Sequence, residues 1–218
     1  MPKLLQAGAS STSLTTPALG GLWVAPPGAL ATEVTSREIR RAPGCYRERM
    51  SRSLLADAFA HHAWATLRLI DTCLSLSPEQ LETAVPGTYG SILETLRHLV
   101  GADCSYLATV TRGRVSRIDE ERMGLRELRA VMEANGPSWS SLLEEDLDPD
   151  AVLIRRRDDG SESHAPLGIR LAQALHHGTD HRSQVCTALT TLRIEPPGID
   201  AWDFAAQDGR LVEVRPTS

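Results

Sequence analysis

Two histidines one helical turn apart are the residues of this sequence with the clearest capacity for chemistry. His177 and His181 fall in the stretch HHGTDHRSQV at residues 176–185, and positions i and i+4 of an α-helix lie on the same face. Two imidazole nitrogens placed in this way can bind one metal ion. The same spacing also arises by chance on exposed helices, and His176 is interpreted as a surface residue of that kind.

A third histidine completes a candidate metal site. His98 lies on another predicted helix, one position off its apolar stripe. Its neighbours on that face are small: Thr95, Ala102 and Ser105. With this helix facing His177 and His181, three neutral nitrogen ligands converge and leave a coordination position open. A divalent ion lowers the pKa of a bound water to about 7, so a bound water or thiol becomes a nucleophile.

Two further residues are candidate catalytic groups. Gln184 lies one turn further along the same face and is predicted to orient a bound water or substrate; a buried amide bonded to the backbone is the alternative. His62, on the inward side of the first predicted helix, is predicted to be a proton shuttle or an extra ligand, with an ordinary core or substrate-wall role as the alternative. Arg182 is expected to pair with a carboxylate on another helix, Asp103 or Glu94.

Helical periodicity indicates the elements that must position these residues. Inward apolar spacing over residues 55–73 predicts a first helix. Ser91 and Glu94 form the capping box SILE, so a second helix begins there and runs to the break at residues 112–114.

A third helix follows over residues 125–132, and the Asn-Gly-Pro sequence at 135–137 is predicted to interrupt or end it, with another turn or two within 138–147. Residues 152–160 indicate a short strand and turn, a hairpin-like connector. A fourth helix is predicted over residues 167–192. Together these elements predict an all-α fold, a four-helix bundle with one long connection before the fourth helix.

The first 49 residues differ from the rest in composition. Ser, Thr, Ala, Gly and Pro dominate residues 1–32, which contain no acidic residue. Such a segment buries too little apolar surface to offset the entropy of ordering. We expect residues 1–49 to be a disordered extension, with Met50 as the translation start. Residues 50–218 are expected to form one bundle domain, with Trp202 pinning its tail.

Charge and composition exclude several classes of function. The net charge of −5 and the scattered arginines argue against nucleic-acid binding. The basic run at residues 155–157 is followed at once by two aspartates, and we interpret it as a solvated turn. No apolar run approaches the roughly 20 residues needed to cross a bilayer. Four cysteines without CxxC spacing suit a reducing compartment, so we expect a cytoplasmic protein.

Three segments, YGSILETLRHLVGADCSYL, LAQALHHGTDHRSQVCTAL and PPGIDAWDFA, resemble the DinB/YfiT-like superfamily of four-helix-bundle metalloenzymes. The resemblance covers roughly residues 50–209. It implies that His98, His177 and His181 bind the divalent metal, and that Arg182 and Gln184 complete the family pattern. It also implies an up-down-down-up bundle, frequent homodimers, and relatives that transfer low-molecular-weight thiols such as bacillithiol or mycothiol.

Three functional hypotheses follow from these residues. The first is a metal-dependent enzyme, a thiol transferase or hydrolase acting on a small molecule. The second is a stress-related bundle that binds metal without turnover, and the third is a structural or interaction module with incidental histidines. The metal is predicted to be Zn or Ni, with Mn or Fe as alternatives, and a low-molecular-weight thiol is the predicted cosubstrate of the transferase.

Overall fold

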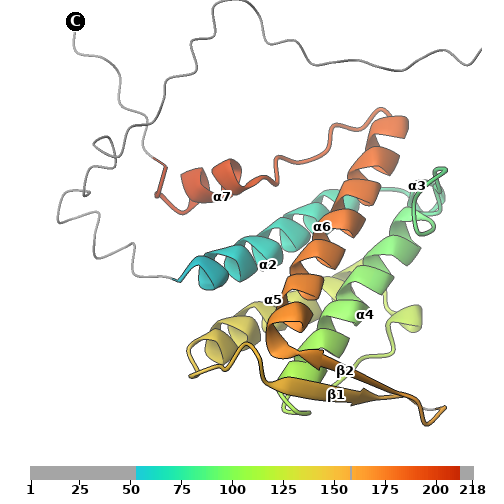
Figure 1. The fold of residues 1–218 in the computed structure, drawn as a ribbon. Coiled ribbons are helices and arrows are strands. Elements are labelled where there is room, and N and C mark those ends of the chain that lie inside the picture. The colour runs from blue at the N-terminus through green and yellow to red at the C-terminus, as the bar shows by residue number, and fades with distance from the viewer. Residues whose placement is uncertain (1–52, 158, 212–218) are drawn as a thin grey trace, which may run out of the picture. The chain divides into compact units, whose positions relative to one another are not determined.

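The computed structural model describes residues 53–157 and 159–211. In this part of the chain the long helices are α2 (Leu54–Cys73), α4 (Ile92–Val110), α5 (Leu125–Leu143) and α6 (Leu167–Thr191) (Figure 1). The short elements are α3 (Pro78–Leu81), the 3-10 turn η1 (Glu120–Arg122), β1 (Val152–Arg156), β2 (Glu162–Pro166) and α7 (Ala201–Gln207). The predicted disordered extension, residues 1–49, and the proposed start at Met50 lie outside the described residues.

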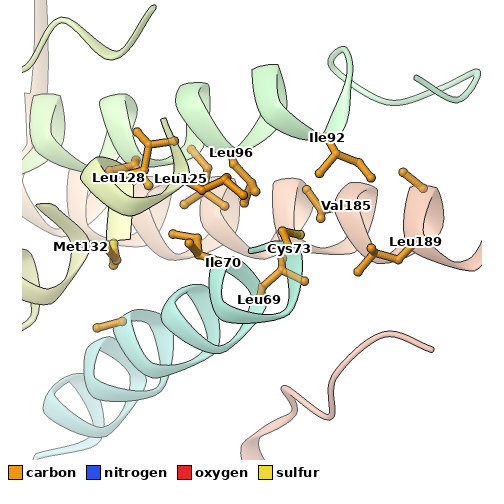
Figure 2. Packing of buried hydrophobic residues seen from close by; sticks show 14 residues of the cluster. Leu69, Ile70, Cys73, Ile92, Leu96, Leu125, Leu128, Met132, Val185 and Leu189 are labelled. Atoms are coloured by element: carbon orange, nitrogen blue, oxygen red, sulfur yellow. The ribbon is translucent and has the colours of Figure 1, made fainter. Parts of the chain in front are cut away.

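The four long helices bury two apolar clusters that fix their directions. One cluster joins the last turns of α2 and α6 to the first turns of α4 and α5, and its side chains converge between the helices in Figure 2. The other joins the first turns of α2 and α6 to the last turns of α4 and α5. Because α2 and α6 run from the second cluster to the first while α4 and α5 run the opposite way, the chain has the predicted up-down-down-up order. The prediction of an all-α four-helix bundle is confirmed.

Local capping explains where the helices begin. The Ser91 hydroxyl accepts the Glu94 N–H, and the Glu94 carboxylate accepts the Ser91 N–H at 2.8 Å, which is the predicted capping box. The Ser53 hydroxyl accepts the Ala56 N–H at the start of α2. Pro166 immediately precedes α6, where its missing N–H costs no helical hydrogen bond.

The third helix is longer than predicted. The Asn-Gly-Pro sequence was expected to interrupt or end it, but α5 continues through Pro137. Proline cannot donate the usual helical hydrogen bond and its ring clashes with the preceding turn, which together cost about 3 kcal/mol in a helix interior. Buried contacts on both sides hold the helix together here, because Met132, Asn135 and Trp139 all face the core. Tertiary packing therefore outweighs the local propensity.

The predicted connector is confirmed as an antiparallel hairpin between α5 and α6. Its register pairs Val152 with Pro166 and Arg156 with Glu162. After α6 the chain returns to α2 through α7, where the Phe204 ring packs on Trp64 with centroids 5.5 Å apart. Trp202 is 69% exposed, so the expectation that it pins the tail is wrong. Leu55, expected to face inward, is 45% exposed because it lies in the first turn of α2, ahead of the buried stripe.

No helix among the described residues combines the length and apolar character that a membrane span requires. Cys73, Cys104 and Cys186 are free thiols, while Cys45 lies outside the described residues.

Candidate metal centre

Three histidines converge between α4 and α6. His98 projects from α4, and His177 and His181 project from successive turns of α6. The Nε2 atom of His177 lies 3.1 Å from His98 Nε2 and 3.2 Å from His181 Nε2. One nitrogen of each ring falls within 4.8 Å of the other two. Nitrogens bound to one zinc ion at about 2.0–2.1 Å need a similar separation, so the set fits a divalent metal.

The position of Gln184 supports one tautomer of His181. The Gln184 side-chain oxygen accepts the backbone N–H of Tyr89 at 2.9 Å and lies 3.1 Å from His181 Nδ1. An amide oxygen can only accept, so His181 carries its proton on Nδ1 and leaves the Nε2 lone pair directed toward the other two histidines. Partners of this kind orient metal-binding imidazoles.

Aromatic rings cover the histidine cluster. The Tyr89 ring stacks on His98 with centroids 4.0 Å apart and an interplanar angle of 8°. Tyr106 meets His177 edge-on with centroids 5.6 Å apart. These contacts restrict the rotation of the imidazole rings, and the Tyr89 ring covers one face of His98.

A cavity of about 470 Å³ opens beside His98. Its walls include Tyr89, Arg97 and Glu120. Glu120 is brought here by η1 and packs against Gly101, one helical turn after His98; a Cβ at position 101 would overlap the Glu120 side chain. Space of this size suits a small molecule.

The environment keeps two of the candidate ligands neutral. Burial, together with the neighbouring His181 and His98, lowers the pKa of His177 to about 4. Burial and His181 also lower the pKa of His98, against a smaller opposite effect of Glu120. Neutral imidazole is the form that binds a metal, so protons compete weakly for these two rings near neutral pH.

Behind the histidine cluster lies a buried polar array centred on Asp103 of α4. The carboxylate accepts from His62 Nε2 at 3.0 Å, from Trp139 Nε1 at 3.0 Å and from Asn135 Nδ2 at 2.8 Å. Arg182 Nη1 lies 3.0 Å from His62 Nδ1. We call these five residues, His62, Asp103, Asn135, Trp139 and Arg182, the buried polar array; they come from all four long helices.

Hydrogen-bonding capacity determines the state of His62. Arg182 can only donate, so His62 Nδ1 accepts and its proton sits on Nε2, facing Asp103. His62 is therefore neutral, and it links a carboxylate to a guanidinium whose pKa burial lowers to about 10, still charged at neutral pH. Opposite charges balance within the array, which is how a buried charge is tolerated.

The structure separates the predicted site residues into two groups. His98, His177, His181 and Gln184 lie together, whereas both ring nitrogens of His62 are engaged within the buried polar array. The catalytic roles predicted for Gln184 and His62 stay predictions. The direct ion pair expected between Arg182 and Asp103 or Glu94 is wrong, because His62 stands between Arg182 and Asp103 and Glu94 caps its own helix.

The sequence alone did not indicate Tyr89, Tyr106, Asn135 or Trp139 as parts of these clusters. One usable signal was the placement of Tyr89 in the loop just before the capping box of the helix that carries His98. The other three occupy ordinary helix positions, and only the packing of facing helices brings their polar atoms to partners.

Comparison with protein-family models matches residues 50–211 to the DinB family. The chain therefore belongs to the DinB family. A search of curated proteins finds no match.

Gly178 stands between the two histidine ligands, where a side chain would disturb the array. A Cβ there would lie 2.6 Å from His62 Nδ1 and 3.0 Å from Arg182 Nη1. We expect Gly178→Ala to lower the free energy of unfolding by about 1–3 kcal/mol, the usual cost of overpacking, as measured by urea denaturation.

Gly136→Ala is the matched control, because it is also a helix-interior glycine and its added Cβ would lie 3.4 Å from the Cβ of Ala63. Alanine's better helix propensity opposes the steric cost of a Cβ before Pro137, so we expect a change of less than about 1 kcal/mol in either direction. Equal destabilisation of the two variants would contradict the tight fit at Gly178.

The lowered pKa of His177 predicts that acid destabilises the metal-free protein. Below its ordinary pKa of 6.5 the unfolded chain takes up a proton that folded His177 does not accept until about pH 4. The free energy of unfolding should fall as pH drops from 6.5 to 4. His177→Gln should show a shallower fall in urea denaturation with a chelator present; an unchanged slope would contradict this origin.

Proposed function

We propose that this DinB family protein is a metal-dependent enzyme in which His98, His177 and His181 hold a divalent ion. The observation that carries the proposal is the convergence of one nitrogen from each ring to within 4.8 Å. These three residues come from helices that meet only in the fold, and each ring is constrained by further contacts. Histidines that lie on a surface by chance would not be expected to converge and to have each ring held by neighbouring side chains.

The ion would supply Lewis acidity, lowering the pKa of a water or thiol at its open position, because three neutral imidazoles leave its charge uncompensated. In this proposal Gln184 keeps the His181 tautomer, and Tyr89 shields the His98 side from water. His62 acts as a positioning residue that holds α6 through Arg182. The donor set suits Zn or Ni best, with Mn or Fe as alternatives.

The cavity beside His98 favours an enzyme over a protein that only stores or senses metal. A bound molecule there would lie next to the histidine cluster, and the walls offer both carboxylates and a guanidinium. We propose a reaction in which an activated thiol or water attacks a small electrophile. With a thiol a C–S bond forms and the leaving group departs with the bonding electrons; with water the product is the hydrolysed substrate.

The homodimer and the cytoplasmic location stay predictions. They rest on the family resemblance and on cysteine usage rather than on any contact described above.

Metal content tests the site directly. Full-length protein without a histidine tag should retain about one divalent ion per chain after purification, and His177→Ala should retain less than about 0.2, measured by elemental analysis. His176→Ala is the matched control, since His176 is the neighbouring, exposed histidine on the same helix. Equal metal content in the two variants would show that the triad is not the metal site.

Turnover distinguishes the enzyme from a metal-binding bundle. Metal-loaded protein should consume an alkyl halide or epoxide with a low-molecular-weight thiol, or hydrolyse an ester, in a panel followed by mass spectrometry. His181→Ala should lower the rate by at least about 100-fold, since the activated nucleophile is lost, whereas His176→Ala should retain it. A metal-loaded protein as inert as His181→Ala across the panel would favour the non-catalytic alternative.

A further inference from the structure

A second cavity lies far along α4 from the histidine cluster and is surrounded by arginines. Its volume is about 460 Å³, and it is formed by the end of α4, the loop that follows and strand β1. The arginines that line it are Arg112, Arg117, Arg155 and Arg156, and no acidic residue lines it. We call this feature the arginine cavity.

The charges of the arginine cavity are mostly uncompensated. Elsewhere arginines sit beside carboxylates: Arg114 pairs with Glu145 at 2.7 Å, and Arg129 pairs with Asp71 and Glu133. Within the cavity only Arg156 has such a partner, Glu162 at 2.7 Å. Arg112, Arg117 and Arg155 form no ion pair with any residue of the described chain.

Arg155 carries an unsatisfied donor as well as an unpaired charge. Its Nε is buried and has no hydrogen-bond acceptor, and the same is true of Arg170 Nε. The two side chains are close enough that Arg155 adds to the effect of burial in lowering the pKa of Arg170. Buried donors without acceptors are rare and costly, and an anion beside Arg155 would provide both an acceptor and a countercharge.

The hairpin holds these arginines on a fixed support. Arg170 Nη2 donates to the carbonyl oxygens of Leu153 and Ser163, both at 2.9 Å, and so joins α6 to both strands. The exposed side chains of Val152 and Ile154, at 60% and 50%, give the cavity an apolar wall beside its guanidinium groups. Cationic groups next to an apolar wall match a molecule with an anionic head and an apolar body.

We propose that the arginine cavity binds a small phosphate monoester with an apolar body. Guanidinium groups form paired, charge-assisted hydrogen bonds with phosphate oxygens, and Val152 and Ile154 would cover the apolar part. The basic run at residues 155–157, interpreted from the sequence as a solvated turn, thereby gains a ligand-binding role through Arg155 and Arg156. The site shares no residue with the metal centre and does not depend on the proposed function.

Fluorescence anisotropy with 2-naphthyl phosphate tests the proposal on the full chain with metal removed. We expect saturable binding, weakened at least tenfold in the double variant Arg112→Gln/Arg117→Gln. Both substituted residues are exposed, so the fold should survive, as circular dichroism would verify. The matched control is Arg126→Gln/Arg193→Gln, which removes two exposed, unpaired charges outside the cavity and should change the affinity less than twofold.

Three further measurements test which part of the probe is recognised and whether it binds in the arginine cavity. Neutral 2-naphthol should bind at least tenfold more weakly, and inorganic phosphate should displace the probe only at much higher concentration. His181→Ala should leave binding unchanged, which separates this site from the metal centre. Absence of saturable binding, equal loss in the two double variants, loss in His181→Ala, or phosphate and 2-naphthyl phosphate of equal affinity would each overturn the proposal.

Discussion

The bridge from Asp103 through His62 to Arg182 is the interaction on which the rest of this bundle depends. A buried carboxylate and a buried guanidinium each carry a large desolvation cost, and only complete pairing makes them tolerable. His62 provides it, because a neutral imidazole accepts on one nitrogen and donates from the other. Asn135 and Trp139 fill the remaining capacity of the carboxylate. The hydrogen bonds of the buried polar array are therefore satisfied together only when the four long helices pack in this arrangement.

The same bridge sets the rotation of α6. Residues one apart on a helix point about 100° from each other, so His181 and Arg182 face different neighbours. Arg182 faces α2 and His62, and His181 consequently faces α4 and His98. One turn earlier, the same two faces of α6 carry Gly178 and His177. Gly178 leaves room for the His62 ring, and His177 joins the histidine cluster. The helix thus presents two polar stripes inside the bundle, one held by hydrogen bonds and the other available to an ion.

Much of the fold could be predicted from the sequence because its signals are local. The capping box at Ser91, the apolar spacing of each helix and the proline before α6 act over a few residues, so they can be read without knowing the fold. The prediction was wrong at Pro137, where the local cost of proline is outweighed by Met132, Asn135 and Trp139 packing into the core. Whether packing outweighs the cost of a proline can be judged only when the positions of the facing helices are known.

For the candidate site too, some properties follow from the sequence and others only from the tertiary structure. Residue type and i, i+4 spacing determined that His177 and His181 share a helix face, and His98 was marked as a third ligand by the small residues around it and by the family pattern. Only the tertiary structure decided that Tyr89 stacks on His98, that Gln184 contacts both Tyr89 and His181, and that His62 is occupied by Asp103 and Arg182. The sequence determines which functional groups a side chain carries. Its protonation state and its free lone pairs depend on partners that packing brings from distant segments.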